Sequence, residues 1–237
     1  MRLPTVFAAG GRELALGDLA LPLDLDDLVP GGGRSGAPES GSPWEVEIGI
    51  GKGRYLLGRA GADPGRRFLG VEVASKYYRL ARRRARHRGL ENLLLVRGEG
   101  LFLLSSVLPR RFASALHVYH PDPWPKSRHA RRRLFDPETV DLVLGVLAPG
   151  GELFFATDFI AYGERVEEIL RGFPGLAVER REAWPEGPRT NYEAKYVREG
   201  RPILRLHGRL DPDAVGGELH PRGARGILAA TARRAAV

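Results

Sequence analysis

The stretch WEVEIGIGKG, residues 44–53, decides the fold of this chain. A short apolar run leads into glycines at positions 49, 51 and 53, and an amphipathic segment follows. Glycines in such a turn let the backbone pass close to a ligand, and the start of the next helix offers free N–H groups. The spacing is G-x-G-x-G, not the G-x-G-x-x-G of dinucleotide-binding proteins, which disfavours a dehydrogenase. The turn alone indicates either a ligand-binding loop or a plain tight turn between a strand and a helix.

The alternation of short apolar runs and amphipathic segments continues along the chain. The apolar runs predict strands at residues 44–50, 68–73, 93–96, 113–119 and 152–156. The amphipathic segments predict helices at residues 53–62, 75–88, 100–108, 137–147 and 159–171. Segments 176–181 and 203–210 can add two strands, as an antiparallel end to the sheet. This pattern predicts an α/β fold with a mainly parallel, seven-stranded sheet and helices on both faces.

The two ends of the 237-residue chain differ in composition from the alternating region. Residues 1–42 are an N-terminal extension that includes most of a Gly/Pro/Ser linker at 30–43. Residues 43–210 are the predicted α/β domain, and residues 211–237 are a Gly/Ala/Arg-rich C-terminal extension. The first 42 residues hold three arginines and six acids, so of the total net charge of +8 the remainder carries +11. A basic domain of this kind favours a polyanionic partner, nucleic acid before membrane.

Several classes of protein are disfavoured by what the chain lacks. It contains no cysteine, which excludes disulfides and thiolate metal sites, and we expect no metal. No run approaches the ~18 apolar residues of a membrane span, and the N-terminus lacks the pattern of a signal peptide. We therefore expect a cytoplasmic protein that does not bind membranes.

Two acids follow the glycine turn at the ends of predicted strands. Glu72 ends the second strand, about 20 residues after the turn, where an acid can accept both hydroxyls of a ribose. Dinucleotide sites and methyl-donor sites share that acid. The glycine spacing favours S-adenosylmethionine, whose sulfonium centre has no pyrophosphate to bind. Glu99 follows the third strand and could bind an adenine amino group or serve only as a solvated acid at a helix start.

The loop HPDPWPKSRHARRRL, residues 120–134, follows the predicted buried strand 113–119. Loops at the carboxyl ends of parallel strands carry the chemistry of open α/β folds. Asp122 offers a hydrogen-bond acceptor to a nucleobase, and Trp124 offers either a stacking face or a core anchor. The cations that follow suit phosphates, although a turn with a solvated run of charges is the alternative; they are Lys126, Arg128, Arg131, Arg132 and Arg133.

A second basic run occupies the predicted helix at 75–88. It has seven basic residues and no acid between positions 76 and 88. Helical spacing places four arginines on one face, at positions 79, 82, 83 and 86. Phosphate binding and a solvated helix face are both consistent with this pattern.

Taken together, the motifs resemble the bacterial tRNA (guanine-N7)-methyltransferase family. The resemblance rests on segments in the family's order: EIGIGKG (47–53), GVE (70–72), PDPWPKSRHARRRL (121–134), ATD (156–158) and TNYEAK (190–195). Spacing alone would make TNYE no more than a helix N-cap with a glutamate at the third position. His120 stands where the family usually has Phe or Ser, Glu99 replaces the more usual Asp, and no basic N-terminal arm is recognisable.

The resemblance implies a Rossmann-like class I methyltransferase fold. It also implies methyl transfer from S-adenosylmethionine to N7 of guanosine 46 in the tRNA variable loop, with S-adenosylhomocysteine as product. It also implies a role for each matching residue. The donor site would comprise Glu47, Gly49, Gly51, Gly53, Glu72, Glu99 and Asp122. Asp122 would be the catalytic acid. The tRNA would contact Lys126, Asp158, Thr190, Asn191, Tyr192 and Glu193, and the arginines beside the site, Arg128 and Arg131, would hold its backbone.

The chemistry of the implied reaction agrees with these residue types. Guanine N7 has a lone pair and no proton, so no strong base is needed, but the product is cationic and a carboxylate at the base edge would stabilise it. Asp122 fits that role, with Asp158 or Glu193 as a helper. Two other functions remain open: methylation of another RNA or of an amino group, and RNA binding without catalysis. We expect tRNA as partner and a monomer or homodimer.

Overall fold

Strands and helices alternate in the order that the sequence predicts. The computed structural model describes residues 5–7, 13–15, 25, 44–124 and 133–213. From residue 44 onward the chain forms five strand–helix units: β3 (Trp44–Ile48) and α1 (Arg54–Ala62), β4 (Arg67–Glu72) and α2 (Ser75–His87), β5 (Leu93–Arg97) and α3 (Gly100–Ser106), β6 (Ala113–Tyr119) and α4 (Val140–Leu144), β7 (Leu147–Thr157) and α5 (Ile160–Arg171). They are followed by β8 (Leu176–Arg181), α6 (Asn191–Arg198) and β9 (Leu204–Leu210).

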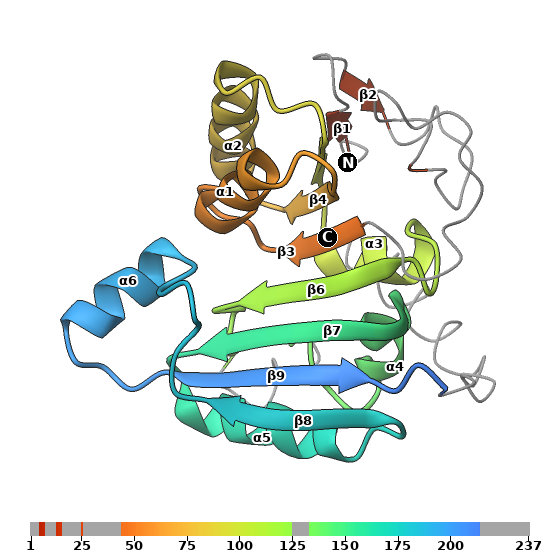
Figure 1. The fold of residues 1–237 in the computed structure, drawn as a ribbon, viewed down its shortest axis with the longest axis vertical. Coiled ribbons are helices and arrows are strands. Elements are labelled where there is room, and N and C mark those ends of the chain that lie inside the picture. The colour runs from red at the N-terminus through yellow and green to blue at the C-terminus, as the bar shows by residue number, and fades with distance from the viewer. Residues whose placement is uncertain (1–4, 8–12, 16–24, 26–43, 125–132, 214–237) are drawn as a thin grey trace.

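The strands form one sheet in which the order β5-β4-β3-β6-β7-β9-β8 contains the seven predicted strands (Figure 1). Strands β3 to β7 are parallel, and β9 runs antiparallel to both of its neighbours, β7 and β8. The mainly parallel, seven-stranded sheet is therefore confirmed. Two short strands, β1 (Thr5–Phe7) and β2 (Glu13–Ala15), extend it beyond the prediction, with β1 antiparallel to the edge of β5.

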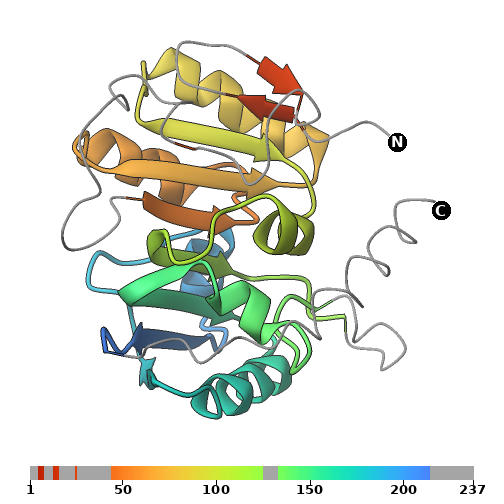
Figure 2. The same ribbon diagram turned by 90° about the vertical axis from the view of Figure 1, so that its right-hand side faces the viewer.

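Helices cover both faces of this sheet, as alternate side chains of its strands show. On β4 and β5, Phe68 and Leu95 pack against α1 and α2. Their neighbours Leu69 and Leu94 belong to the larger cluster on the opposite face, which includes side chains of α3, α4 and α5. Figures 1 and 2 show the two helix layers from directions at right angles. A third cluster, of aromatic side chains, lies around Tyr55, Tyr119 and Trp184.

The parallel strands bring the sequence motifs to one edge of the sheet. In Figure 1 their carboxyl ends point to the left, where α6 also lies. The glycine turn follows β3, Glu72 ends β4, Glu99 follows β5, Asp122 follows β6 and Asp158 follows β7. The chain leaves β3 and β6, neighbours in the sheet, toward opposite sides, and this kind of switch point is where open α/β sheets bind ligands. In the described ranges no helix is both long and apolar enough to span a membrane.

Candidate active site

The glycine turn combines a backbone that requires glycine with open space in front of it. Gly49, Gly51 and Gly53 have φ angles of 80°, 52° and 72°, in the left-handed region that side chains disfavour. A Cβ at Gly49 or Gly51 would meet no atom within 4 Å. A Cβ at Gly53 would lie 2.9 Å from Leu57 Cδ1, so this glycine serves the close packing of α1. The turn is thus a cradle whose open side can hold a ligand.

Glu72 is joined to this turn by hydrogen bonds. Its Oε2 accepts the Gly51 amide at 2.8 Å, and its Oε1 accepts the Ala74 amide at 2.8 Å. A carboxylate has about four acceptor positions, so each oxygen keeps one for another donor. The side chain is therefore held in one orientation and can still accept ribose hydroxyls.

Glu47 is the most unusual acid of the site. It is 2% exposed, and its Oε2 has no hydrogen-bond partner among the described residues. Burial raises the pKa of Glu47 to about 8, and the charge of Glu72 acts in the same direction, while the Leu56 backbone amide opposes them. A buried acceptor without a partner costs free energy unless a ligand supplies the donor. The geometry thus fits a ligand with a cationic or N–H group at this position.

Glu99 begins α3 as its N-cap. Its Oε2 accepts the Phe102 amide at 2.7 Å, which satisfies one of the free N–H groups of the first turn. The structure therefore shows the helix-start role that the sequence left open, and binding of an adenine amino group stays a prediction.

The loop after β6 holds two residues in the left-handed region. His120 has φ 50° and Trp124 has φ 40°, and such positions cost roughly 1–3 kcal/mol each and tend to occur at functional sites. Arg133 secures the loop: its Nε donates to the Pro123 carbonyl at 2.9 Å and its Nη2 donates to the Trp124 carbonyl at 3.0 Å. Asp122, between the two strained residues, is exposed.

Arg133 thus has a structural role within the loop, and its contact with phosphate stays a prediction. Its guanidinium is half-buried, occupied by loop carbonyls and 5.4 Å from the centre of the Tyr162 ring. The other cations of the motif, Lys126, Arg128, Arg131 and Arg132, lie outside the described residues.

Asp158 connects three parts of the site. Its Oδ1 lies 3.2 Å from His120 Nδ1, and its Oδ2 accepts Arg201 Nη2 at 2.9 Å. The Arg201 guanidinium also lies 4.0 Å from the centre of the Tyr196 ring on α6. Burial lowers the pKa of His120, while Asp158 opposes this effect. These contacts join the ends of β6 and β7 to α6; the sequence did not point to Arg201.

The TNYE segment begins α6, and its members have different surroundings. Thr190 Oγ1 accepts the Glu193 amide at 3.0 Å, which is the predicted N-cap. Glu193 is 0% exposed; its Oε2 accepts the Arg189 amide at 2.8 Å and its Oε1 accepts Arg205 Nε at 2.6 Å. Glu193 thus holds the segment together from inside, whereas Asn191 and Tyr192 are exposed, Tyr192 at 56%.

An aromatic box that the sequence did not predict lies around Arg189, next to this segment. Four rings lie within 6 Å of the guanidinium carbon: Tyr55, Tyr119, Phe154 and Trp184. Arg189 Nη1 donates to Tyr119 Oη at 2.5 Å, and its Nε donates to Glu186 Oε1 at 2.6 Å. The rings come from α1, β6, β7 and the segment before α6, so no local sequence pattern reveals the box. Among the described residues no cluster of side chains could hold a metal ion.

Comparisons with known proteins identify the family of this chain. A family described as "Putative methyltransferase" matches residues 42–206. The tRNA (guanine-N(7)-)-methyltransferase of Anaeromyxobacter dehalogenans is 41% identical over 187 residues, covering 76% of this chain and 91% of the relative. The enzyme of the same name from Chromohalobacter salexigens is 38% identical and covers 70% of this chain and 70% of the relative. That from Halorhodospira halophila is 35% identical and covers 82% of this chain and 82% of the relative.

Solved structures support the fold alone. The 16S rRNA methyltransferase KamB has a TM-score of 0.58 at 18% identity, covering 87% of this chain and 100% of its own. The antibiotic-resistance methyltransferase Kmr has a TM-score of 0.54 at 18% identity, covering 87% of this chain and 99% of its own. These likenesses confirm the Rossmann-like class I methyltransferase fold. The relatives confirm the resemblance drawn from the motifs, and the chain therefore belongs to the S-adenosylmethionine-dependent tRNA (guanine-N7)-methyltransferase family.

Proposed function

We propose that this protein transfers the methyl group of S-adenosylmethionine to N7 of guanosine 46 in the variable loop of tRNA. The observation that carries the proposal is the cradle at the end of β3, where open glycines, a fixed Glu72 and an unpartnered Glu47 meet. S-Adenosylmethionine, when bound, supplies an electrophilic methyl group on a sulfonium sulfur.

The residues of the cradle fit the chemical groups of that donor. Glu72 has free acceptor positions for the two ribose hydroxyls, and Gly49 and Gly51 leave room beside the backbone. The α-amino group of the methionine part would give Glu47 its missing partner, and its positive charge would favour the ionised carboxylate. Glu99 remains the proposed acceptor for the adenine amino group.

The residues on the β6 and β7 side of the cradle would receive the guanine. Asp122 accepts hydrogen bonds from the N1–H and amino edge of the base and stabilises the positive charge that develops on methylation at N7. The exposed ring of Tyr192 offers a stacking surface for a base taken out of its stack. Asp158, fixed by His120 and Arg201, is placed to assist. The proposal extends to tRNA contacts by Lys126, Arg128, Arg131, Thr190 and Asn191.

The direct test is incubation of the protein with labelled S-adenosylmethionine and an unmodified tRNA transcript, followed by nucleoside analysis. We expect label in 7-methylguanosine and none in a matched transcript in which adenosine replaces guanosine 46. Label in another nucleoside would mean that the methyl acceptor is a different one. Failure to bind the donor by calorimetry, with tRNA binding intact, would instead indicate an RNA-binding protein without catalysis. A cytoplasmic location and a monomeric or homodimeric state remain part of the proposal.

A further inference from the structure

Helix α2 lies directly beside the donor cradle. It begins at Ser75, three residues after Glu72, and buries Tyr78, Ala81 and Ala85 against α1 and the sheet. A Cβ on Gly53 would lie 3.4 Å from Ala81 Cβ, and Arg84 Nη1 donates to the Lys52 carbonyl at 2.8 Å. The helix is thus fixed against the glycine turn.

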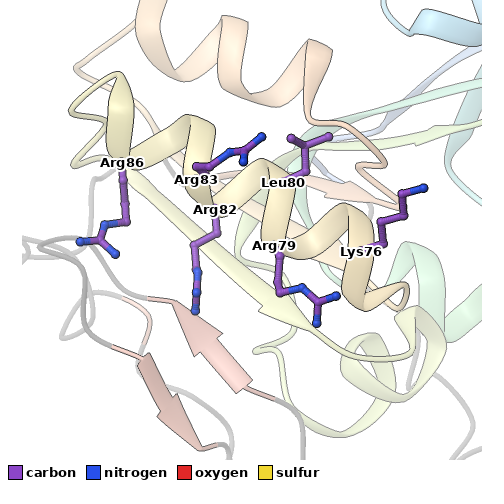
Figure 3. A pocket seen from close by; sticks show the side chains of 6 residues that line it. All are labelled: Lys76, Arg79, Leu80, Arg82, Arg83 and Arg86. Carbon is purple, nitrogen blue, oxygen red and sulfur yellow. The ribbon is translucent and has the colours of Figure 1, made fainter.

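The outer face of α2 carries a concave, basic surface, which we call the α2 groove. It is a surface cavity of about 600 Å³, lined by Lys76, Arg79, Leu80, Arg82, Arg83 and Arg86. Figure 3 shows Arg79, Arg82 and Arg86 extending from one side of the helix and Arg83 from the other. From Lys76 to Arg86 the cations extend along ~15 Å of the helix axis.

The charges of this helix are not those of an ordinary solvated face. Helix α2 contains no acid, and like charges spaced three and four residues apart destabilise a helix. Within the described part of the chain, Lys76, Arg79, Arg83 and Arg86 make no ion pair. Helix α5 is the contrasting case, because Arg165 pairs with Glu168 and Arg171 with Glu167 along its surface. An anionic partner on this face would relieve the repulsion between the cations of α2.

We propose that the α2 groove binds the phosphodiester backbone of the same tRNA whose guanine enters the active site. This inference rests on the proposed function and adds a second contact surface to it. Guanidinium groups suit phosphate because they donate two parallel hydrogen bonds to its oxygens. A membrane surface is the poorer partner, since a membrane-bound helix needs a free apolar face and the apolar face of α2 is buried in the core.

The test replaces three arginines of the groove, Arg79→Gln, Arg83→Gln and Arg86→Gln, in one variant. Its matched control removes the same charge far from α2, with Arg165→Gln, Arg181→Gln and Arg209→Gln on α5, β8 and β9. Equilibrium binding of unmodified tRNA is measured from low to high salt, S-adenosylmethionine binding by calorimetry, and methylation at saturating tRNA. Gln has a helix propensity close to that of Arg, so α2 is expected to fold, as circular dichroism would verify.

We expect the groove variant to bind tRNA roughly 10- to 100-fold more weakly at 0.15 M salt and to flatten the slope of log K against log salt by about 2 to 3. Donor binding and the rate at saturating tRNA stay unchanged, and an Arg→Lys triple at the same positions restores most of the affinity. The control triple shows a much smaller loss.

Wild-type affinity and slope in the groove variant would overturn the inference, even if the wild-type enzyme forms 7-methylguanosine. So would a variant that keeps tRNA affinity but loses binding to vesicles containing phosphatidylglycerol. Absence of methylation by the wild-type protein, with tRNA affinity still dependent on the groove, would instead count against the proposed function.

Discussion

At the scale of single residues, the acids of the site differ in burial and in the hydrogen bonds that the protein supplies to their carboxylate oxygens. Glu72 is held by two backbone amides, Glu47 is buried with an oxygen that lacks a partner, and Asp122 is exposed between two strained residues. A fixed acid suits orientation of a ligand, an unpartnered one suits binding of a donor group, and an exposed one can meet a base that arrives from solvent. Residue type was predictable from the motifs, but this division of roles depends on burial and contacts.

Replacing Asp122 by Asn should slow methyl transfer more than it weakens binding. The amide keeps the size of the side chain but removes the charge that would face the cationic product in the proposed reaction, so we expect the single-turnover rate to fall on the order of 100-fold. Rates are measured with saturating tRNA and donor, and donor affinity by calorimetry. Asp141→Asn on α4 is the control and should retain the full rate. A near-normal single-turnover rate in the Asp122 variant would remove this carboxylate from the mechanism.

Glu47 should make the donor-free protein less stable as the pH rises. Its pKa is about 8 in the folded state against 4.5 for an ordinary glutamate, so between these values the folded state holds a proton that the unfolded state has lost. The stabilisation is complete below pH 4.5 and is lost progressively up to about pH 8, by on the order of a few kcal/mol. Glu47→Gln should remove this dependence and be the more stable protein at pH 8.

Urea denaturation of both proteins at intervals between pH 5 and pH 8, without donor, measures the effect. The difference between their unfolding free energies isolates Glu47, because His117 and His120, whose pKa burial lowers, are present in both. Parallel pH profiles would show that position 47 does not titrate in this range.

At the scale of elements, hydropathy patterns predicted the strands and helices of the core. They did not predict the short strands and strand ends that depend on pairing between residues far apart in the sequence. Strand β7 begins at Leu147, five residues before the prediction, because Leu147 pairs with Ala113 across an irregularity in the ladder. That pairing accounts for the end of α4 (Val140–Leu144) before Leu147. Strands β1 and β2 have three residues each, too few for a periodic signal, and they are defined only by the pairing of β1 with β5 and of β2 with β1. Helix α6 was visible only as a capping pattern.

The aromatic box around Arg189 should position α6 for tRNA. Arg189→Gln loses the ring contacts and the hydrogen bond to Tyr119, and we expect a loss of about 2–3 kcal/mol in unfolding free energy. Because Arg189 adjoins the N-cap of α6, the KM for tRNA should rise while the affinity for S-adenosylmethionine stays close to wild type. Arg198→Gln, at the exposed end of α6, is the matched control for charge. Equal losses of donor and tRNA affinity would show that the box supports the whole fold and not α6 in particular.

At the scale of the whole molecule, topology explains why scattered motifs form one site. Because β3 to β7 are parallel, segments from residues 47 to 158 meet at one edge of the sheet, and α2 and α6 begin at that edge. Strand–helix alternation in the sequence was sufficient to predict this edge. The sequence could not show that Arg201 reaches Asp158 or that Arg189 enters a box of four rings, since those contacts join residues that only the fold makes neighbours.

Donor binding at the central strands should stabilise the whole protein. A ligand that binds only the folded state at 100 times its Kd adds about 2.7 kcal/mol to the unfolding free energy. Gly51→Ala should lose most of this increment, because its Cβ would enter the open side of the cradle, and the left-handed backbone should cost the free protein about 1–2 kcal/mol. Gly89→Ala, after α2, is the matched control, with φ 61° and open space around its Cβ, so it should show the same cost but keep the donor increment. Urea denaturation with and without S-adenosylmethionine measures both terms, and an equal donor increment in the two variants would place the donor away from the glycine turn.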